Sequence, residues 1–334
     1  MKKPFFVAEI SANHNGKIQY AKKLILTAKK FGADAVKVQT FTQNNMTINS
    51  NKKNFIIKMG LWKGYKLWDL YNKAQTPLSW HKEIFDYAKK NKIKIFSTPF
   101  DEQMVDFLEK LNCPMYKIAS FEMNDLNLVK KIALTKKPII LSTGLASMRE
   151  ITNSVNTAKK HGAKDITLLY CVSNYPSNNS DFNLYNIKIL KDTFKCRIGL
   201  SDHSTNNKIA NLALVMGAEI FEKHIALAGQ RKGLDIEFSL KGKQIKYYKD
   251  ELVETYNLIK KKYFFRSKDE KRNLIFRRSI YAIKDIKRGE IFSKYNIKCL
   301  RPAIGLSADK FLSLLGKKSR VKLKKFQLLR KNFI

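Results

Sequence analysis

Eight short runs of strand-forming residues constrain the possible fold more than any other feature of this chain. They are FFVAEI (5–10), AVKVQT (35–40), KIFSTP (94–99), MYKIAS (115–120), PIILST (138–143), ITLLYC (166–171), RIGLSD (197–202) and IFEKHI (220–225). Most intervals between them show helical periodicity, as in Ala21, Leu24, Ile25 and Ala28, and Ser79 is placed to N-cap another helix. This alternation predicts a (β/α)8 TIM barrel rather than an open doubly wound sheet, because the chain carries no glycine-rich nucleotide-binding turn.

Composition excludes wholesale disorder but leaves the partner open. With 334 residues, 44% of them hydrophobic, the chain can fill a core. Its net charge of +37 would attract phosphates, nucleic acids or acidic lipid headgroups alike. The apolar start breaks at Glu9, and no later apolar run approaches the roughly 20 residues of a membrane span. Because Cys113, Cys171, Cys196 and Cys299 lie far apart, we expect reduced thiols and a cytoplasmic location.

Changes in residue pattern predict three segments. Residues 1–240 are expected to form the barrel, 241–275 a lysine-rich helical connector, and 276–334 a small β-rich domain with turns at KRGE and LGKK. Residues 40–78 are too long for a simple connection between barrel elements. This insertion carries Trp62, Tyr65, Trp68 and Tyr71, and we expect it to be a lid that faces the substrate.

Polar side chains gather where the predicted strands end, which is where catalytic groups lie in TIM barrels. In chain order they are Glu9, Asn13, His14, Lys37, Gln39, Thr98, Lys117, Ser120, Ser142, Thr143, Tyr175, Ser201, Asp202, His203, Glu222 and His224. Packing alone does not explain so many polar residues at one rim.

Two chemical subsets stand out among these residues. Two cations and three hydroxyls would cradle a phosphate and a carboxylate, as phosphoenolpyruvate requires, and these are Lys37, Thr98, Lys117, Ser120 and Ser142. His203 and His224 follow neighbouring strands, and two imidazoles can hold a divalent metal whose other positions take water and substrate oxygens. Glu222 shares a strand face with His224 and can orient water or take a proton.

Two further carboxylates are catalytic candidates from the rim loops. Asp235 lies in GLDIEFS after the last strand, where it can bond a sugar hydroxyl or the water shell of a metal, and Glu9 can do likewise from the opposite rim. Structural interpretations remain open beside these. The lysines could be surface residues, the lid aromatics a loop core, and SerThrGly at 142–144 a turn. We expect His81 and His161 to be structural, and His14 is undecided.

The order of the motifs resembles the sialic acid synthase family over nearly the whole chain. The matching segments are AEISANHNG (8–16), ADAVKVQTF (33–41), FSTPFD (96–101), YKIAS (116–120), LSTG (141–144), CVSNYP (171–176), GLSDHS (199–204), EKHI (222–225) and RRSIYAIKDIKRGE (277–290) with RPAIG (301–305). The last two resemble the antifreeze-like (SAF, β-clip) module that follows the barrel in this family.

This resemblance implies a transferase that condenses phosphoenolpyruvate with an N-acetylated aldose to a nine-carbon 2-keto acid. It implies phosphoenolpyruvate on the two lysines and three hydroxyls, and manganese, or magnesium or cobalt, on His203 and His224. Glu9, Tyr175, Glu222 and Asp235 match positions around the sugar and the reacting water. The resemblance also implies a homodimer in which Arg301 of the SAF-like module covers the partner's barrel mouth and bonds the acyl group.

Residues 61–86 are most similar to the pseudaminic acid synthases, whose sugar is a 6-deoxy hexose with two acetamido groups. Two positions depart from common family patterns, because Ser173 stands where asparagine is frequent and Ala303 where glycine is frequent. The alternatives are synthesis of N-acetylneuraminic or legionaminic acid. A nucleic-acid-binding protein is the rival outside the enzymes, but the lysines are scattered and the chain shows no recognised binding motif.

Overall fold

Eight parallel strands close into a barrel in the computed structural model, which describes residues 2–334. The strands are β1 (Phe5–Glu9), β2 (Ala35–Thr40), β3 (Lys94–Pro99), β4 (Tyr116–Ile118), β5 (Ile139–Ser142), β6 (Ile166–Cys171), β7 (Arg197–Asp202) and β8 (Ile220–Ala226). Each strand pairs with the next in sequence, and β1 pairs with β8, which closes the sheet. The predicted TIM barrel is therefore confirmed, and every strand lies within its predicted run except β8, which continues one residue further to Ala226.

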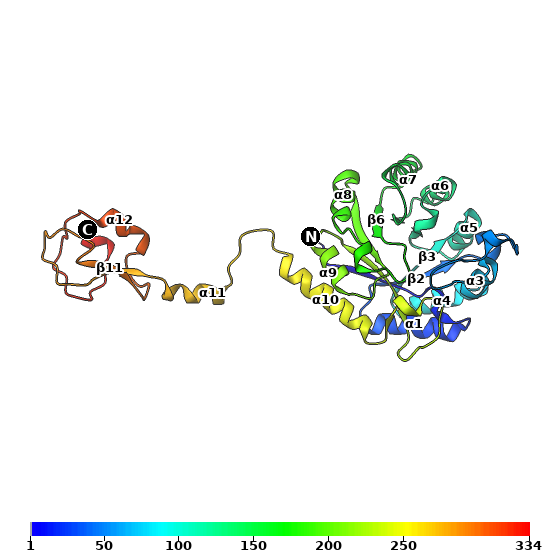
Figure 1. The fold of residues 1–334 in the computed structure, drawn as a ribbon, viewed down its shortest axis with the longest axis horizontal. Coiled ribbons are helices and arrows are strands. Elements are labelled where there is room, and N and C mark those ends of the chain that lie inside the picture. Colours follow the sequence, from blue (N-terminus) through cyan, green and yellow to red (C-terminus); the bar gives the residue numbers. More distant parts are fainter. Residues whose placement is uncertain (1) are drawn as a thin grey trace. The chain divides into compact units, whose positions relative to one another are not determined.

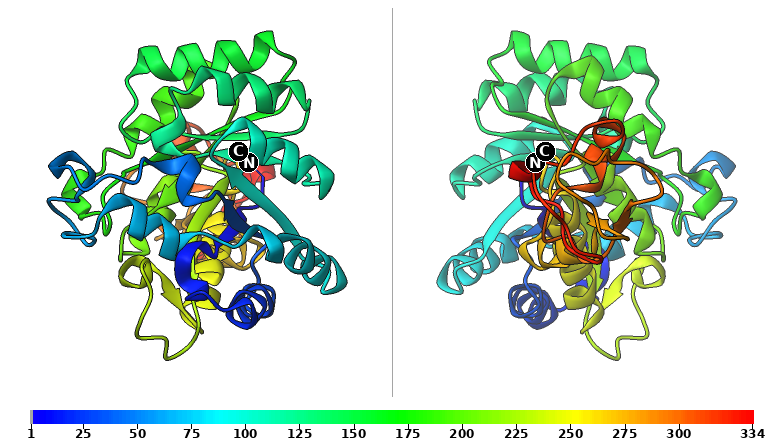
Figure 2. Two further views of the ribbon diagram at one scale, coloured as in Figure 1. Left: turned by 90° about the vertical axis from the view of Figure 1, so that its right-hand side faces the viewer. Right: turned by 90° about the vertical axis from the view of Figure 1, so that its left-hand side faces the viewer.

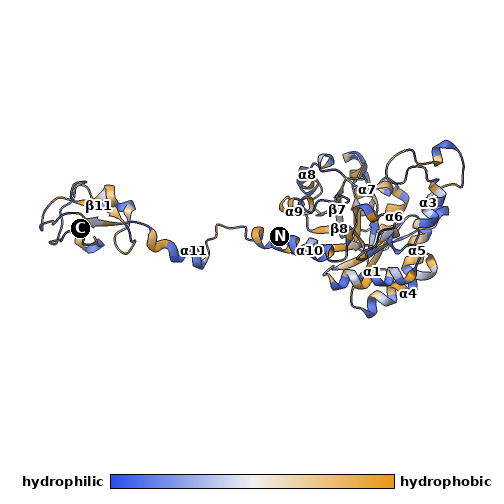
Figure 3. Ribbon diagram, turned by 60° about the horizontal axis from the view of Figure 1, so that its bottom comes forward, coloured by the Kyte–Doolittle hydropathy of each residue, from blue (hydrophilic) through white to orange (hydrophobic). Residues whose placement is uncertain are grey.

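Helices surround the strands (Figures 1 and 2). Around the barrel they are α1 (Ile18–Lys30), α4 (Leu78–Lys90), α5 (Glu102–Lys110), α6 (Leu126–Leu134), α7 (Met148–Lys160), α8 (Tyr185–Phe194) and α9 (Lys208–Val215). The four apolar positions predicted for α1, 21, 24, 25 and 28, are all buried. Colouring by hydropathy shows the corresponding hydrophobic and hydrophilic faces on these helices (Figure 3).

One predicted helix start is wrong by two residues. Helix α4 begins at Leu78 with Pro77 at the N-cap position, so Ser79 lies inside the first turn and caps nothing. A proline has a fixed φ near the value that a helix start requires and lacks the N–H that would be unpaired there. Pro77 therefore sets the start of this helix without a side-chain cap.

The insertion between β2 and α4 contains its own short helices. They are α2 (Gln43–Met46) and α3 (Leu67–Ala74), with a 3-10 turn at Lys53–Phe55 between them. Leu70 is buried, and Phe41 at the end of β2 packs edge-on against Tyr71 and Phe100. The insertion thus has an aromatic anchor at the rim of the barrel.

The barrel unit extends through Lys260, beyond its predicted end at residue 240. A two-residue strand, β9 (Leu240–Lys241), pairs with β8, and α10 (Gln244–Ile259) follows it. Ile245, Tyr248 and Leu252 of α10 belong to the core of the barrel. The first half of the expected connector is therefore a packed helix, because its apolar positions recur at helical spacing and find the barrel surface.

Residues 261–334 form a second compact unit with a core of its own. It contains α11 (Lys268–Arg272), the antiparallel strands β10 (Ser279–Ala282) and β11 (Ile297–Leu300), and α12 (Phe311–Leu314). Its core side chains are Ile280, Ala282, Ile286, Phe292, Ile297, Leu314, Leu323 and Leu329. The small β-rich domain predicted at 276–334 lies within this unit.

The remaining elements and the cysteines add little to the architecture. The other 3-10 turns are Ser11–His14, Ser120–Glu122, Asn179–Asp181, Ile236–Phe238, Asn273–Phe276, Ala308–Lys310 and Lys331–Phe333. All four cysteines are free thiols. Within residues 2–334, none of the helices combines the length and apolarity that crossing a membrane requires.

Candidate active site

A polar cavity lies at the carboxyl ends of the barrel strands. It is lined by Lys37, Gln39, Thr98, Lys117, Ala119, Ser120, Phe121, Ser142, Cys171, Tyr175, Ser201, His203, Glu222 and His224. All five residues predicted for phosphoenolpyruvate, both predicted metal ligands, Tyr175 and Glu222 are among them. Strand alternation explains the convergence, because residues two apart on one strand, such as Lys37 and Gln39 or Glu222 and His224, face the same side.

Lys37 and Lys117 are buried, with 2% and 3% exposure, so they are not surface lysines. The Lys37 ammonium lies 2.5 Å from Glu9 Oε2 and donates to Thr98 Oγ1 at 2.9 Å. The Lys117 ammonium donates to Glu222 Oε1 at 2.9 Å. Burial by itself would lower the pKa of Lys37, but Glu222 and Glu9 outweigh it and raise that pKa. Lys37 is therefore charged.

The two carboxylates beside these lysines differ in protonation. Burial raises the pKa of Glu9 to about 7 despite the opposing charge of Lys37. Burial also acts on Glu222, but Lys117 and Lys37 together hold its pKa below the ordinary value. Glu222 is thus an ionised acceptor at neutral pH, whereas Glu9 exchanges its proton near neutrality. Glu9 lies behind Lys37 and does not line the cavity itself.

One hydroxyl of the predicted anion cradle has no partner. The side-chain oxygen of Ser142 is buried and makes no hydrogen bond. Beside it, Gly144 donates its N–H to Ser120 Oγ, and a Cβ at position 144 would lie 2.2 Å from Ser173 Oγ and 2.7 Å from Ser120 Oγ. A buried unpaired hydroxyl costs stability unless a ligand bonds it. These features therefore fit the binding of an oxygen-rich anion.

His203 and His224 fit an open metal site. Their ring centroids are 5.5 Å apart. His203 Nδ1 lies 3.0 Å from the carbonyl oxygen of Val172, and donation there leaves Nε2 as the free ligand nitrogen. His224 Nδ1 is buried without a hydrogen bond, and burial together with His203 holds the pKa of His224 well below its usual range, so the ring is neutral.

The protein alone would leave several coordination positions of such a metal free. Over residues 2–334, no three His, Cys, Asp or Glu side chains form a group that could hold an ion. Two imidazoles are nevertheless suitable ligands for a divalent transition metal, and substrate oxygens and water can complete its shell. Burial acts to lower the pKa of His203, but Cys171 raises it, so a metal bound there would have to compete with a proton. The fit is that of a metal that also binds substrate, rather than a closed structural site.

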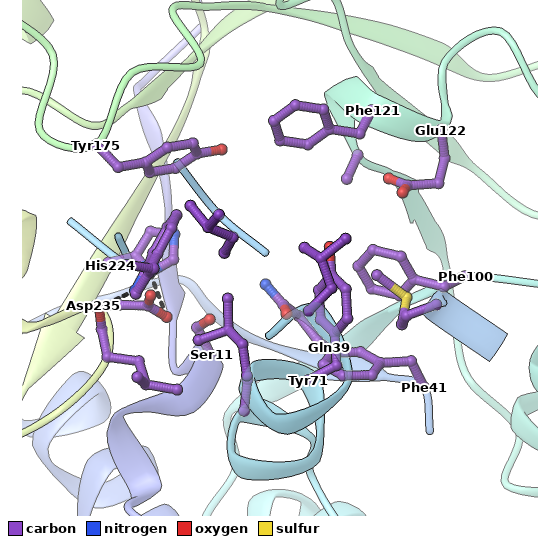
Figure 4. Close-up of a pocket in the computed structure, with 18 of the residues that line it drawn as sticks. Ser11, Gln39, Phe41, Tyr71, Phe100, Phe121, Glu122, Tyr175, His224 and Asp235 are labelled. Atoms are coloured by element: carbon purple, nitrogen blue, oxygen red, sulfur yellow. Dashed lines mark hydrogen bonds and ion pairs between the residues drawn. The ribbon is translucent and has the colours of Figure 1, made fainter. Parts of the chain in front are cut away.

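A larger and more apolar cavity of about 260 Å³ adjoins the polar one (Figure 4). The two share Gln39, Ala119, Phe121, Tyr175 and His224. The other residues that line it are Ser11, Phe41, Met46, Ile57, Trp62, Leu67, Leu70, Tyr71, Ala74, Phe100, Glu122, Leu234, Asp235 and Phe238. Seven of these, from Met46 to Ala74, belong to the insertion. Of the four aromatic residues singled out in the insertion, Trp62 and Tyr71 line this cavity, whereas Tyr65 and Trp68 do not. The role of the insertion as a lid over the substrate stays a prediction.

Asp235 lies in the larger cavity beside His224. Its Oδ2 is 3.7 Å from His224 Nδ1 and accepts the N–H of Ala12, and burial raises the pKa of Asp235. Arg301, in contrast, is an exposed residue of the second unit, where it lines a surface pocket with Arg277 and Arg278. The structure describes that unit by itself, so the expected role of Arg301 at a barrel mouth stays a prediction.

Glu122 is a site residue that the sequence analysis missed. It lines the larger cavity, its Oε2 is buried without a hydrogen bond, and burial raises its pKa to about 7. It lies two residues after Ser120 on a 3-10 turn. The alternation of side chains along a strand therefore could not predict the direction in which it points. The sequence signal that could have found it is its position between a strand and the following helix, where active-site residues of TIM barrels lie.

The remaining histidines have structural surroundings. His81 is buried between the hydroxyl of Thr40 and the carbonyl of Pro77, as expected of a packing residue. His14 is also buried, lies edge-on to Trp80, and accepts the N–H of Gly16 on Nδ1. His161 follows α7, with Nδ1 2.9 Å from the carbonyl of Thr157. None of the three lines the two cavities.

This arrangement, a closed β/α barrel with buried lysines and paired histidines at its strand ends, defines an enzyme for small anionic substrates. Residues 24–263 match the model of the NeuB family, and residues 277–334 match the SAF domain. The chain belongs to the NeuB family, and the resemblance to sialic acid synthases is confirmed.

Curated relatives match almost end to end. The chain is 42% identical to a pseudaminic acid synthase of Campylobacter jejuni, over 95% of this chain and 93% of that one. It is 41% identical to the pseudaminic acid synthase of Helicobacter pylori, over 96% and 94%. With the N,N'-diacetyllegionaminic acid synthase of Campylobacter jejuni it shares 38% identity, over 99% and 100%.

A solved structure also matches. The N-acetylneuraminic acid synthetase of Leptospira borgpetersenii superposes with a TM-score of 0.73 and 29% identity, covering 82% of this chain and 91% of that one. The spore coat polysaccharide biosynthesis protein E of Chromobacterium violaceum has a TM-score of 0.80 at 24% identity, over 99% of both chains, and supports the fold alone.

Proposed function

We propose that this protein is a pseudaminic acid synthase, which condenses phosphoenolpyruvate with 2,4-diacetamido-2,4,6-trideoxy-altrose to give pseudaminic acid and phosphate. The observation that carries the proposal is the direct contact between two cavities, one with buried lysines and one largely apolar. A carbon–carbon bond between an anion and a weakly polar sugar requires both sites side by side. The two pseudaminic acid synthases described above, at 42% and 41% identity, support the choice of sugar.

Phosphoenolpyruvate would replace the carboxylates as partner of the lysines. Lys37 and Lys117 would bind its phosphate and carboxylate, and the hydroxyls of Thr98, Ser120 and Ser142 would donate to the remaining oxygens. Since these groups are fixed by strands, little reorganisation is needed when charge shifts to the leaving phosphate. The lysines thus stabilise the phosphate during attack and departure.

The reaction breaks a C–O bond of phosphoenolpyruvate. Its C3 attacks the sugar aldehyde carbon, water adds at C2, and the tetrahedral intermediate collapses to the keto acid and phosphate. Glu222, ionised between two lysines, is placed to accept the proton of the added water. His203 and His224 would hold a divalent ion together with water and substrate oxygens, and this ion when bound would supply Lewis-acid polarisation of the aldehyde oxygen. Asp235 and Tyr175 would orient the sugar.

The assembly and location belong to the same proposal. We propose a homodimer in which Arg301 contacts the sugar held by the partner, and manganese as the metal. The four free thiols are compatible with the reducing cytoplasm. A nucleic-acid-binding function is disfavoured, because family membership over most of the chain accounts for the buried lysines without it.

Mass spectrometry of the product tests this function. The chain is incubated with phosphoenolpyruvate, manganese and, in parallel, the 6-deoxy diacetamido altrose, the legionaminic acid precursor and N-acetylmannosamine. We expect pseudaminic acid and one equivalent of phosphate from the first sugar at the highest kcat/KM. Legionaminic acid synthase is the second candidate because of the 38% identity over 99% of the chain. A higher kcat/KM with its precursor would replace our proposal.

A further inference from the structure

The insertion after β2 forms one wall of the larger cavity, and its chemistry points to a role in sugar selection. We propose that this wall, formed by Met46, Ile57, Leu67 and Leu70 with Phe100, receives the C6 end of the sugar and selects 6-deoxy sugars over their 6-hydroxy analogues. Hereafter we call these five residues the apolar wall. The inference rests on the proposed function and assigns specificity to residues outside the motifs.

The arrangement of the two cavities fixes the direction of the sugar. The new bond joins C3 of phosphoenolpyruvate to the aldehyde carbon, so that carbon must lie where the polar and apolar cavities meet. Gln39, Tyr175 and His224 line both cavities and mark this junction. The opposite end of the sugar must then extend into the part that belongs to the larger cavity alone.

Figure 4 shows polar residues together at one end of the larger cavity, and phenylalanines together with Glu122 at the other. Ser11, His224 and Asp235 lie together on one side, and Phe41 and Phe100 lie across from them. An aldehyde next to His224 therefore directs the other end of the molecule toward the phenylalanines. All five side chains of the apolar wall lack hydrogen-bonding groups.

Among the polar groups that line this cavity, the indole of Trp62 is already engaged, whereas Glu122 Oε2 has no hydrogen-bond partner. The indole N–H of Trp62 donates to the carbonyl of Leu234 at 2.9 Å. The wall is also held in place, because Phe41, 2% exposed, packs against Phe100 with ring centroids 5.1 Å apart. A methyl group fits the five residues of the apolar wall, whereas a hydroxyl placed against them loses its water and gains no partner from the wall itself. An apolar pocket discriminates against an added hydroxyl by about 100-fold at most.

A pair of methionines in the insertion provides a matched test. Met46→Gln changes a cavity-lining thioether to an amide of similar shape, and Met59→Gln makes the same change at a residue that is 79% exposed and outside the cavity. Full-length chains are assayed with 2,4-diacetamido-2,4,6-trideoxy-altrose and with its 6-hydroxy analogue. We expect the kcat/KM ratio of the two sugars to fall roughly tenfold in Met46→Gln and to stay unchanged in Met59→Gln.

A second pair of variants controls for a folding defect. Ile57→Asn alters the cavity, and Ile48→Asn alters an isoleucine of the same insertion that is 70% exposed and outside it. The ratio should fall with Ile57→Asn alone. Equal losses for both sugars, or an unchanged ratio in both cavity variants, would overturn the inference while leaving the synthase function intact. Failure of the wild-type chain to make product from any sugar would instead refute the synthase function, and the inference with it.

Discussion

Lys37 and Lys117 illustrate how this barrel tolerates two buried cations. Each ammonium has a carboxylate partner, Glu9 for the first and Glu222 for both. Buried charges are costly unless paired, and the pairs are in place before an anion arrives. Binding of phosphoenolpyruvate at these lysines, as proposed above, would exchange internal partners for external ones and would free Glu222 for proton transfer.

The proposed metal can be tested through His203, one of its two expected ligands. His203→Ala should reduce turnover at ordinary metal concentrations by at least about 100-fold, because a single imidazole remains and metal catalysis contributes several kcal/mol. His161→Ala, a change outside both cavities, should leave turnover unchanged. Chelation should abolish wild-type activity, and manganese should restore it. Full activity of the wild-type chain in chelating buffer would remove the metal from the mechanism.

Glu122 carries a prediction on pH. Burial raises its pKa from 4.5 to about 7, so the folded chain binds this proton more tightly than the unfolded chain. The stability contributed by this group is present at low pH. It is lost as the pH rises from the unfolded-state pKa of 4.5 through the folded-state pKa of about 7. Glu122→Gln mimics the protonated form. Its free energy of unfolding relative to that of the wild type should therefore rise by roughly 2 kcal/mol between about pH 5 and pH 8. Urea unfolding at both pH values measures this, and a constant difference would contradict it.

At the scale of elements, the strands place catalytic and structural charges on opposite faces. His203 and Glu222 line the cavity, while their neighbours Asp202 and Lys223 form a buried ion pair at 3.1 Å on the other face. Asp202 also accepts the N–H of Ser204. This pair joins β7 to β8 directly beside the two histidines.

Breaking that pair should cost stability rather than substrate affinity. Lys223→Met leaves the carboxylate of Asp202 buried and unpaired, and should lower the free energy of unfolding by about 3 kcal/mol. Asp202→Asn in the same chain should recover part of the loss. Denaturant unfolding checks the energies, and Lys94→Met, an exposed lysine on β3, is the control. An unchanged midpoint in Lys223→Met would show that the pair contributes nothing.

Strand alternation made most of the polar cavity predictable. Lys37, Thr98, Ser142, His203 and Glu222 follow from period-two spacing on runs whose ends the sequence marks clearly. The shape of the larger cavity did not follow, because it depends on how α2 and α3 of a 39-residue interval, 40–78, pack on Phe41. The start of α4 at Leu78 was also not predicted, because Pro77 at the N-cap position makes no side-chain capping hydrogen bond that a sequence pattern would reveal.

At the scale of the whole molecule, the two units have separate cores. Apolar residues of the first come from the barrel and α10, and those of the second from residues 280–334. The first unit contains both cavities, and the second contains Arg301. The roles proposed for the barrel in binding phosphoenolpyruvate and for Arg301 in contacting the sugar can therefore be tested separately.

A chain ending at Lys260 should fold cooperatively, because its core is complete. By calorimetry it should bind phosphoenolpyruvate as the full chain does, yet it should turn over the sugar at least about tenfold more slowly if Arg301 contributes a charged hydrogen bond. Arg301→Ala in the full chain should reproduce the loss. Full turnover by the shortened chain would refute the role of Arg301.

The pairing of β1 with β8 has a consequence for biosynthesis. In this register Glu9 lies opposite His224, so residues of the first and last barrel strands meet only when the sheet closes. A nascent polypeptide emerging from the ribosome exposes Lys37 long before Glu222 and His224 are translated. Until β8 is translated the sheet cannot close, so the side-by-side placement of Glu9 and His224 arises late in synthesis.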